Sequence, residues 1–375
     1  MIPYGRQSVS EEDVRAVTAV LQSDWLTTGP KVEEFEKAIS EYTGTSEGVS
    51  VSSGTAALHT AVYAAGIGKG DEVIVPPMTF AATANAVLYQ GGRPVFVDVD
   101  PDTLLIDVAK VEQKINEKTK AIISVDYAGQ PCDYDALRKL ATNHHLFFIS
   151  DACHALGAEY KGDKVGKQAD ISAFSFHPVK HITTGEGGMV LTNRHDLAER
   201  SRLFRNHGIN RTFKERASNE TWYYEMIDLG FNYRLSDIQC ALGISQLKRL
   251  SEGLRRRREV ASMYNDAFSH QELVKPLGIV PYGVHAYHLY VVKVNKRMTT
   301  RAKIFASLRS QGIGVNVHYI PVHLHPYYRE HLGTTKGMCP VAEEAYEQIL
   351  SLPMYDKLTD EEVHSVVEAV RKSGL

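Results

Sequence analysis

Short apolar runs alternate with amphipathic stretches along the first half of the chain. Each apolar run fits one strand and ends at Gly, Pro, Asp or Ser, while the amphipathic stretches repeat their apolar positions with helical spacing. The expected strands lie in residues 48–54, 71–77, 94–100, 121–129, 146–151, 171–176 and 189–193. The expected helices are residues 12–21, 32–42, 55–65, 82–90 and 134–144. This order predicts an α/β fold with a mostly parallel sheet buried on both faces.

The pattern changes after residue 193. A helix-rich region is expected from Asp196 to about Asn265, including a helix over 238–250. After it we expect strands over 285–294 and 314–321, a helix over 301–311, and a closing helix over 360–372. The change of character near residues 250–270 indicates two domains, which we place at 1–255 and 256–375.

Charge and cysteine content narrow the class of protein. In 375 residues, 42 Lys and Arg nearly balance 45 Asp and Glu, which gives a net charge of −3 and no basic footprint for nucleic acid or an anionic membrane. The chain has no apolar run long enough to cross a bilayer and does not begin as a secretory signal. Its cysteines are too scattered for a zinc site or a disulfide framework, so we expect no metal and a cytoplasmic location. These cysteines are Cys132, Cys153, Cys240 and Cys339.

Residues 52–58, SSGTAAL, place small residues where a strand ends and a helix begins. The first amides of such a helix have no partner inside it, and together with the helix dipole they attract an anion such as a phosphate. Ser53, Gly54 and Thr55 are therefore candidate phosphate ligands. The glycine spacing matches neither the dinucleotide fingerprint nor the P-loop, and an ordinary Ser/Thr helix cap is the alternative.

Asp151 follows directly after the apolar run LFFIS. Ligands of open parallel sheets bind beyond the carboxyl ends of the strands, where a carboxylate can hold a proton on a ring nitrogen. The alternative is that Asp151 caps a short helix. His154 lies three residues further on and faces either the ligand or the core.

Lys180 follows the strand expected over 171–176, within SFHPVKHITTGEGG. Small and apolar neighbours would desolvate this lysine and disfavour its ammonium form, and a neutral amine can form a Schiff base. A solvent-facing loop lysine is the alternative. His177 and His181 are four residues apart, but Pro178 breaks the helix that a metal-binding pair would need.

These three signals occur together in the combination that pyridoxal phosphate requires. Its phosphate needs an anion site, its ring nitrogen an acid partner and its aldehyde a lysine. Phe80 could stack on the ring face, with core packing as the alternative. The sequence therefore predicts pyridoxal phosphate as cofactor.

The same segments resemble the DegT/DnrJ/EryC1/StrS family of sugar aminotransferases, which are fold type I pyridoxal-phosphate enzymes. The resemblance covers nearly the whole chain. It implies a large domain with a mostly parallel sheet and a small C-terminal α/β domain. It is most specific in residues 52–58, 125–133, 150–158, 175–188 and 230–243.

The resemblance implies roles for the matching residues. Lys180 would bind the cofactor aldehyde and carry the proton, and Asp151 would pair with the pyridinium nitrogen. Many members have Gln where this chain has His154, and a dehydratase branch has His in place of the lysine, so Lys180 favours transamination. The other implied cofactor contacts are Ser53, Gly54, Thr55, Phe80, His154, Ser175 and, from the second subunit of a homodimer with shared sites, Asn232.

Residues 125–135 and 222–243 are most similar to the branch of the family that works in pseudaminic acid biosynthesis. That branch transfers the amino group of L-glutamate to carbon 4 of a UDP-linked 4-keto-6-deoxy-N-acetyl-L-sugar. A UDP-D-sugar, a dTDP-sugar or a GDP-sugar is the alternative acceptor. The resemblance implies a nucleotide-sugar pocket formed by Tyr4, Asp24, Trp25, Leu26, Thr27, Asn316, Val317, His318 and Tyr319.

Two other functions remain to be weighed. Cysteine desulfuration would need a cysteine on a loop near the cofactor, a context that Cys339 does not have. A cofactor-binding regulator would need a DNA-binding domain, and the family pattern begins too near the N-terminus to leave room for one. We interpret the arginine run at 255–258 as a solvated helix face that joins the domains, not as a nucleic-acid site.

Overall fold

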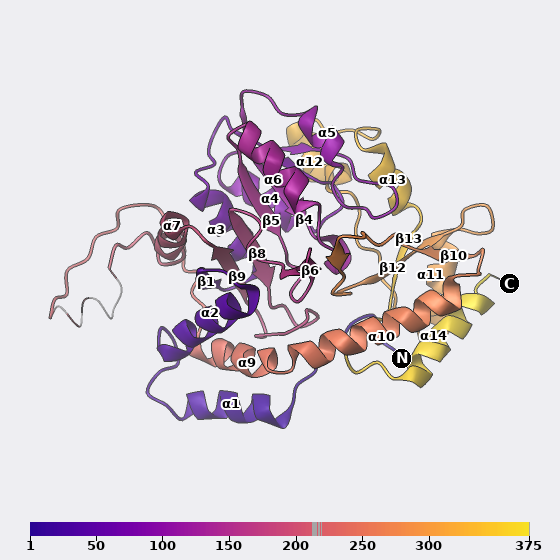
Figure 1. The fold of residues 1–375 in the computed structure, drawn as a ribbon, viewed down its shortest axis with the longest axis horizontal. Coiled ribbons are helices and arrows are strands. Elements are labelled where there is room, and N and C mark those ends of the chain that lie inside the picture. Colours follow the sequence, from indigo (N-terminus) through magenta and orange to yellow (C-terminus); the bar gives the residue numbers. More distant parts are fainter. Residues whose placement is uncertain (212–215, 217, 219, 375) are drawn as a thin grey trace.

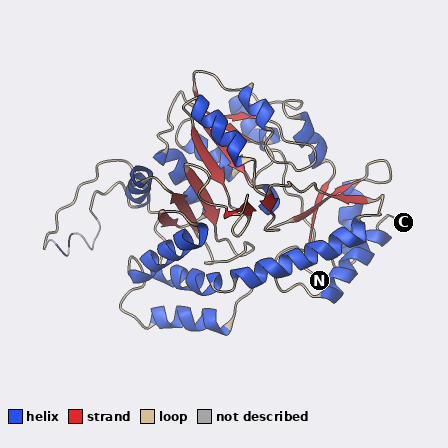
Figure 2. Cartoon of the chain, in the orientation of Figure 1, coloured by secondary structure: helices blue, strands red, loops and turns tan. Residues whose placement is uncertain are grey.

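The computed structural model describes residues 1–211, 216, 218 and 220–374. Helices surround a central sheet, and a second, smaller sheet lies toward the C-terminal end of the chain (Figure 1, Figure 2). No helix in the described part of the chain has both the length and the apolar character needed to span a membrane.

The central sheet has seven strands in the order β1-β9-β8-β5-β4-β2-β3. Only β9 runs antiparallel to its neighbours, so β1, β2, β4, β5 and β8 all end at one edge of the sheet. The mostly parallel sheet predicted from the sequence is confirmed. The strands are β1 (Glu47–Val51), β2 (Glu72–Val75), β3 (Arg93–Phe96), β4 (Thr119–Val125), β5 (Phe147–Asp151), β8 (Ile171–Ser175) and β9 (Gly188–Thr192).

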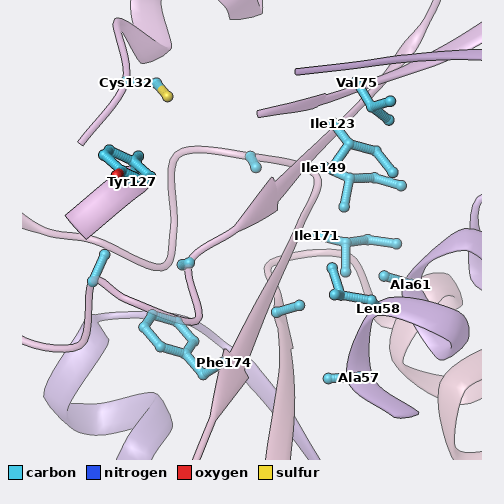
Figure 3. Packing of buried hydrophobic residues seen from close by; sticks show 14 of the residues in the cluster. Ala57, Leu58, Ala61, Val75, Ile123, Tyr127, Cys132, Ile149, Ile171 and Phe174 are labelled. Carbon is cyan, nitrogen blue, oxygen red and sulfur yellow. The ribbon is translucent and has the colours of Figure 1, made fainter. Parts of the chain in front are cut away.

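Burial on both faces explains why these strands read as nearly continuous apolar runs. Figure 3 shows Val75, Ile123, Ile149 and Ile171 side by side on adjacent strands, with Leu58 of α3 packed nearby. The helices of this part are α1 (Glu11–Leu21), α2 (Pro30–Thr43), α3 (Gly54–Ala64), α4 (Ala82–Tyr89), α5 (Val108–Glu112), α6 (Tyr134–Asn143), α7 (His195–Arg205) and α9 (Asp237–Leu247).

A second three-stranded sheet, in the order β10-β12-β13, forms near the C-terminal end of the chain. Its strands are β10 (Val274–Pro276), β12 (Tyr290–Val294) and β13 (Ile349–Leu352). The accompanying helices are α10 (Leu250–Phe268), α11 (Arg301–Ser310), α12 (Pro326–Leu332), α13 (Pro340–Tyr346) and α14 (Asp360–Lys372). A further small sheet joins β6 (Glu159–Tyr160), β7 (Asp163–Lys164) and β11 (Gly283–Val284).

The long helix α10 contributes to two hydrophobic clusters. Leu254 near its start packs with the central sheet, whereas Tyr264 and Phe268 pack in the smaller cluster. We therefore propose that the two domains meet within α10, close to the expected boundary at residue 255. Residues of α12 and α13 pack back onto the central core, which the division by chain order did not foresee.

The strand expected over 285–294 begins only at Tyr290. The segment before it bonds elsewhere, because the amides of Ala286 and Leu289 donate to the carbonyls of Gly129 and Ala128 at 2.8 and 3.1 Å. The expectation of one continuous strand is therefore wrong. His288 lies between Ala286 and Leu289, in the segment that is held against the turn at Ala128 and Gly129.

The strand expected over 314–321 is also wrong. Asn316 forms an isolated bridge with Ser351, and beyond it the chain turns away from the sheet. The amide of Val322 instead donates to the carbonyl of Pro77 at 2.9 Å. This detour carries His318 and Tyr319 to the edge where the central strands end.

The helix-rich region expected from Asp196 to Asn265 is found as α7, α9 and α10, but the described residues 221–235 between them contain no helix. Residues 212–215, 217 and 219 of this region lie outside the described part of the chain. The described residues 206–211 and 220–235 extend outward beside α7, and we call them the arm (Figure 1).

The arginine run at 255–258 is a solvated face only in part, because Arg255 is exposed and pairs with Glu259 at 2.7 Å, whereas the other three are buried or half-buried. Arg257 is buried, and its guanidinium donates to the carbonyls of Tyr287 and Met354, both at 3.1 Å. Arg258 reaches the carbonyls of His285 and Gly157 at 3.4 and 3.5 Å. Arg257 and Arg258 therefore tie α10 to neighbouring backbone segments.

Candidate active site

A cavity of about 590 Å³ lies at the edge where β1, β2, β4, β5 and β8 end. The parallel topology explains its position, because the loops that follow these strands all begin at this edge. The cavity is lined by Tyr4, Ser53, Gly54, Thr55, Leu58, Thr79, Phe80, Ala82, Thr83, Val125, Asp151, Cys153, His154, Ser175, His177, Val179, Lys180, Glu186, His288, Asn316, Val317, His318 and Tyr319.

Asp151 is the last residue of β5 and is buried, with two hydrogen-bond donors on its carboxylate. The Thr83 hydroxyl donates to Oδ2 at 2.6 Å, and the Cys153 amide donates to Oδ1 at 3.2 Å. Thr83 in turn bonds the hydroxyl of Thr79 at 2.7 Å. Both threonines were missed by the sequence reasoning, because only the packing of α4 against the sheet brings them to Asp151.

Lys180 lies in the turn after β8, is half-buried and lines the cavity. Burial lowers the pKa of Lys180, while Cys153 and Asp151 act in the opposite direction. Its Nζ lies 3.5 Å from Nε2 of His288. The alternative of a solvent-facing loop lysine is therefore wrong.

Helix α3 begins at the floor of the cavity. Ser53 caps it, since its hydroxyl accepts from the Ala56 amide at 3.0 Å, as the cap alternative supposed. The first helical amides, at Gly54 and Thr55, have no acceptor inside the helix. A Cβ at Gly54 would lie 2.8 Å from the Cβ of Ser175, so only glycine allows α3 and β8 to approach this closely.

Aromatic side chains form another wall of the cavity. Phe80 is 60% exposed, which excludes the core-packing alternative, and its ring centroid lies 6.1 Å from that of Tyr319. The Tyr319 hydroxyl and Nε2 of His154 are hydrogen-bonded at 3.1 Å. Burial and nearby Lys180 hold the pKa of His154 well below its usual range, so this histidine is neutral.

The segment around His318 faces the cavity from the C-terminal part of the chain. Nδ1 of His318 bonds the Ser351 hydroxyl at 2.8 Å, and its ring lies 5.6 Å from that of Tyr4. Burial lowers the pKa of His318 to about 4. Asn316 reaches Nε2 of His318 at 3.4 Å.

Some expected site residues lie outside this cavity. Asn232 is exposed on the arm, where it bridges to Asn206, and residues 24–27 run along the start of α9, where Thr27 bridges to Ser236. Asp24, Trp25, Leu26 and Thr27 therefore do not line the pocket of their own chain. Their expected roles, and that of Asn232, require a second copy.

His177 and His181 do not form a pair. His177 lines the cavity, whereas Nε2 of His181 faces the carbonyl of Ala286 at 3.0 Å. In the part of the chain that the structure describes, no three His, Cys, Asp or Glu side chains are arranged to hold a metal ion.

The residues around the cavity fit pyridoxal phosphate. An amine, a carboxylate, the open start of a helix and an exposed aromatic face surround one space. The glycine at residue 54 leaves a cradle that a larger residue would fill. Nδ1 of His154 and Nδ1 of His288, two residues that line the cavity, are buried without a hydrogen-bond partner in the described structure, so a bound group could supply one.

Comparison with known proteins gives matches over nearly the whole chain. A model of the DegT/DnrJ/EryC1/StrS aminotransferase family matches residues 7–371. SpsC of Bacillus subtilis, a spore coat polysaccharide biosynthesis protein, is 42% identical over 378 residues, which cover 99% of this chain and 96% of that protein.

Two solved structures show the same fold. PseC of Helicobacter pylori, an aminotransferase involved in the biosynthesis of pseudaminic acid, matches with a TM-score of 0.92 and 37% identity, covering 99% of this chain and 98% of that one. Spr1654 of Streptococcus pneumoniae, in its PMP form, matches with a TM-score of 0.94 and 32% identity, covering 100% and 99%. Spr1654 has also been solved in its PLP form.

Proposed function

The chain belongs to the DegT/DnrJ/EryC1/StrS aminotransferase family, and we propose that it transfers the amino group of L-glutamate to carbon 4 of a UDP-linked 4-keto-6-deoxy-N-acetyl-L-sugar. The products would be 2-oxoglutarate and UDP-4-amino-4,6-dideoxy-N-acetyl-β-L-altrosamine, a precursor of pseudaminic acid. The likeness to PseC over nearly the full length of both chains supports this substrate. The observation that carries the chemistry is the convergence of Lys180, Asp151 and the start of α3 on one cavity.

Pyridoxal phosphate, when bound, carries the amino group from donor to acceptor and takes up the negative charge of the reacting carbon. We assign its phosphate to the amides of Gly54 and Thr55 and the hydroxyl of Ser175. Asp151 would hold the proton on the ring nitrogen, and Thr83 fixes the orientation of that carboxylate. Phe80 offers its exposed ring as a stacking surface.

Lys180 would move the proton in both halves of the reaction. Its Nζ removes the proton from the α-carbon of glutamate in the first half and delivers a proton to carbon 4 of the sugar in the second. A group that accepts and then donates works best when its pKa lies near the working pH. Burial moves the pKa of Lys180 in that direction.

The sugar nucleotide would bind on the side of the cavity formed by Tyr4, Asn316, Val317, His318 and Tyr319. These side chains combine stacking surfaces with hydrogen-bonding groups, and a pKa of about 4 keeps His318 neutral at physiological pH. Neutral partners of this kind recognise sugar hydroxyls through hydrogen bonds without attracting unrelated anions.

We further propose a homodimer with shared active sites. The arm that carries Asn232 exposes large apolar side chains, with Trp222 83% and Leu229 71% exposed, and Trp25 and Leu26 are exposed as well. An exposed apolar set of this size is typical of an interaction surface. The four free cysteines fit a reducing compartment, and we place the enzyme in the cytoplasm.

The test is mass spectrometry of a reaction that contains the protein, pyridoxal phosphate, L-glutamate and the UDP-4-keto-6-deoxy-N-acetyl-L-sugar. The D-configured epimer is run in parallel. We expect the amino sugar from the L-epimer only. Amination of the D-epimer alone would overturn the proposed substrate while leaving the aminotransferase chemistry intact.

A second candidate acceptor is a different nucleotide-linked 4-keto-6-deoxy sugar. The 42% identity to SpsC, whose name ties it to a spore coat polysaccharide, supports this alternative. Parallel reactions with dTDP-linked and GDP-linked 4-keto sugars separate the two, because the nucleotide remains attached to the product and sets its mass.

A further inference from the structure

We propose that His288 is a positioning residue for Lys180. Its neutral imidazole accepts a hydrogen bond from the free side-chain nitrogen of Lys180 and directs the lone pair of that nitrogen toward the cavity. The proposal rests on the proton-transfer role proposed for Lys180 and extends it to a residue that the motifs did not indicate. The contact behind it is the distance of 3.5 Å between Nζ of Lys180 and Nε2 of His288.

The surroundings leave His288 only one useful protonation state. The imidazole is buried, and burial together with Lys180, His154, His181 and Arg257 holds its pKa well below the usual range. The ring is therefore neutral, and one of its nitrogens is an acceptor. An ammonium group can only donate, so protonated Lys180 requires Nε2 to be that acceptor.

The same contact orients Lys180 when it is neutral. A neutral amine has two N–H bonds and one lone pair, so an N–H directed at His288 leaves the lone pair directed elsewhere. The groups that face Lys180 from the other elements are Asp151, Cys153, His154 and His318. Asp151 is assigned to the cofactor ring and Nε2 of His154 bonds Tyr319, whereas Nε2 of His288 lies 3.5 Å from Nζ, so His288 is the neighbour suited to hold the nitrogen in place.

The fold fixes the backbone of His288 from two sides. Arg257 of α10 donates to the carbonyls of Tyr287 and His288 at 3.1 and 3.4 Å. On the other side, a Cβ at Gly129 would lie 3.0 Å from the amide of His288 and 2.7 Å from the carbonyl of His154. The glycine therefore allows the segment around His288 to press against the turn that holds His154, where the two imidazole centroids are 4.3 Å apart.

The test uses the enzyme loaded with the amine form of the cofactor, in which Lys180 is free. Competitive acetylation with acetic anhydride across a pH series, read by mass spectrometry of the Lys180 peptide, reports the pKa of this amine. His288→Phe keeps a flat ring but removes the acceptor, so the pKa of Lys180 should fall by about one unit, the equivalent of one hydrogen bond to a charged group. His288→Gln supplies an acceptor and should restore most of the shift.

The matched control is His181→Gln. His181 is half-buried beside His288, with ring centroids 5.8 Å apart, but its Nε2 faces the carbonyl of Ala286 rather than Lys180. This variant should leave the labelling profile of Lys180 unchanged. If His288→Phe does not fold, His288→Asn, whose shorter amide ends away from Nζ, replaces it with the same expected shift.

Turnover gives a second readout. For His288→Phe we expect kcat to fall by about 10- to 100-fold with little change in KM for glutamate, because the contact acts on proton transfer and not on donor binding. An unchanged labelling profile in His288→Phe, or an equal shift in His181→Gln, would overturn the proposal. The labelling uses no sugar, so a failure of the proposed sugar substrate leaves this result readable on its own.

Discussion

The molecule contains two regions built around buried histidines, and they differ in how their polar atoms are satisfied. His59 in α3 bonds the Tyr233 hydroxyl through Nδ1 at 3.1 Å and Gln90 through Nε2 at 2.8 Å. The rings of Phe204 and Phe231 pack around it with centroids 5.0 and 5.1 Å away. Each nitrogen of this histidine is used, and the cluster anchors the arm to α3.

The histidines beside Lys180 are arranged differently. Nδ1 of both His154 and His288 is buried without a partner in the described structure, and their remaining nitrogens face Tyr319 and Lys180. Leaving a buried polar atom unpaired costs free energy, so each such atom calls for an explanation. The two regions therefore contain equally buried histidines with different hydrogen bonding: both nitrogens of His59 are paired, whereas His154 and His288 each have one unpaired nitrogen beside the cavity.

The largest effect is expected from Lys180→Ala. Removing the amine deletes the group that we propose moves the proton, so turnover should fall by about 10²–10⁴-fold. The unfolding midpoint should stay near that of the wild type, because a buried amine is lost and no hydrogen-bonded carboxylate is exposed. Turnover is measured by formation of 2-oxoglutarate, and substantial residual turnover would contradict the role of Lys180.

Thr83→Val tests whether the Asp151 carboxylate, which lines the cavity, must be held in place by a hydrogen bond. The substitution removes the hydroxyl that donates to Oδ2 of Asp151 at 2.6 Å while keeping the side-chain volume. We expect kcat/KM to fall by about 10- to 100-fold, the equivalent of one hydrogen bond to a charged group. Thr60→Val is the control, since the Thr60 hydroxyl is buried without a partner in the described structure. Equal losses in both variants would argue against a specific role of Thr83.

Gly54→Ala tests the cradle at the start of α3. The added Cβ would lie 2.8 Å from the Cβ of Ser175, and overpacking of this kind costs about 1–3 kcal/mol. Cofactor affinity, measured by titration of the apoenzyme, should weaken by about 5- to 100-fold. Gly68→Ala, where a Cβ meets open space, should bind the cofactor as the wild type does. Unchanged affinity in Gly54→Ala would remove the start of α3 from the cofactor site.

His59→Leu tests the structural cluster. It leaves the Tyr233 hydroxyl and Gln90 without their shared partner, so the free energy of unfolding should fall by about 1–3 kcal/mol in a urea titration. The absorbance of the bound cofactor should remain. Loss of cofactor absorbance with unchanged stability would mean that the cluster around His59 supports cofactor binding and is not a purely structural region.

The smallest effect concerns pH. Burial lowers the pKa of His59 to about 4 and that of His285 to about 3, below the ordinary value of 6.5. At a pH between the ordinary pKa of 6.5 and these lowered pKa values, the unfolded chain binds protons that the folded chain does not. The free energy of unfolding therefore decreases as the pH falls from about 6.5 to 4. Thermal unfolding midpoints over this range should decline, and His59→Leu should show a shallower slope. An equal slope in the variant would contradict the assignment to His59.

Much of this architecture was predictable from local sequence signals. The apolar runs located every strand of the central sheet, and the strand ends at Ser53, Asp151 and Ser175 led to the cavity because parallel strands share a carboxyl edge. Lys180 stood out for the apolar character of its neighbours. These signals depend on neighbouring residues in the sequence, so they can be recognised without knowledge of the tertiary structure.

The remainder depended on contacts between distant segments. His288 sits in a stretch that alternates like a strand, yet its backbone neighbours bond to the turn at Ala128 and Gly129. Thr83 near the start of α4 reaches Asp151 at the end of β5 only in the folded chain, and Arg257 is buried where it bonds the carbonyls of Tyr287 and Met354. Nothing in the local sequence distinguishes these residues from a strand histidine, a helix threonine or a surface arginine.

The most direct test of the account is the identity of the lysine that holds the cofactor. Reduction of the wild-type holoenzyme with sodium borohydride fixes the cofactor to its lysine, and peptide mass spectrometry then locates the modification. The account predicts a phosphopyridoxyl group on the peptide that contains Lys180. A modification on a different lysine, or none in a protein that shows the visible absorbance of bound cofactor, would contradict it.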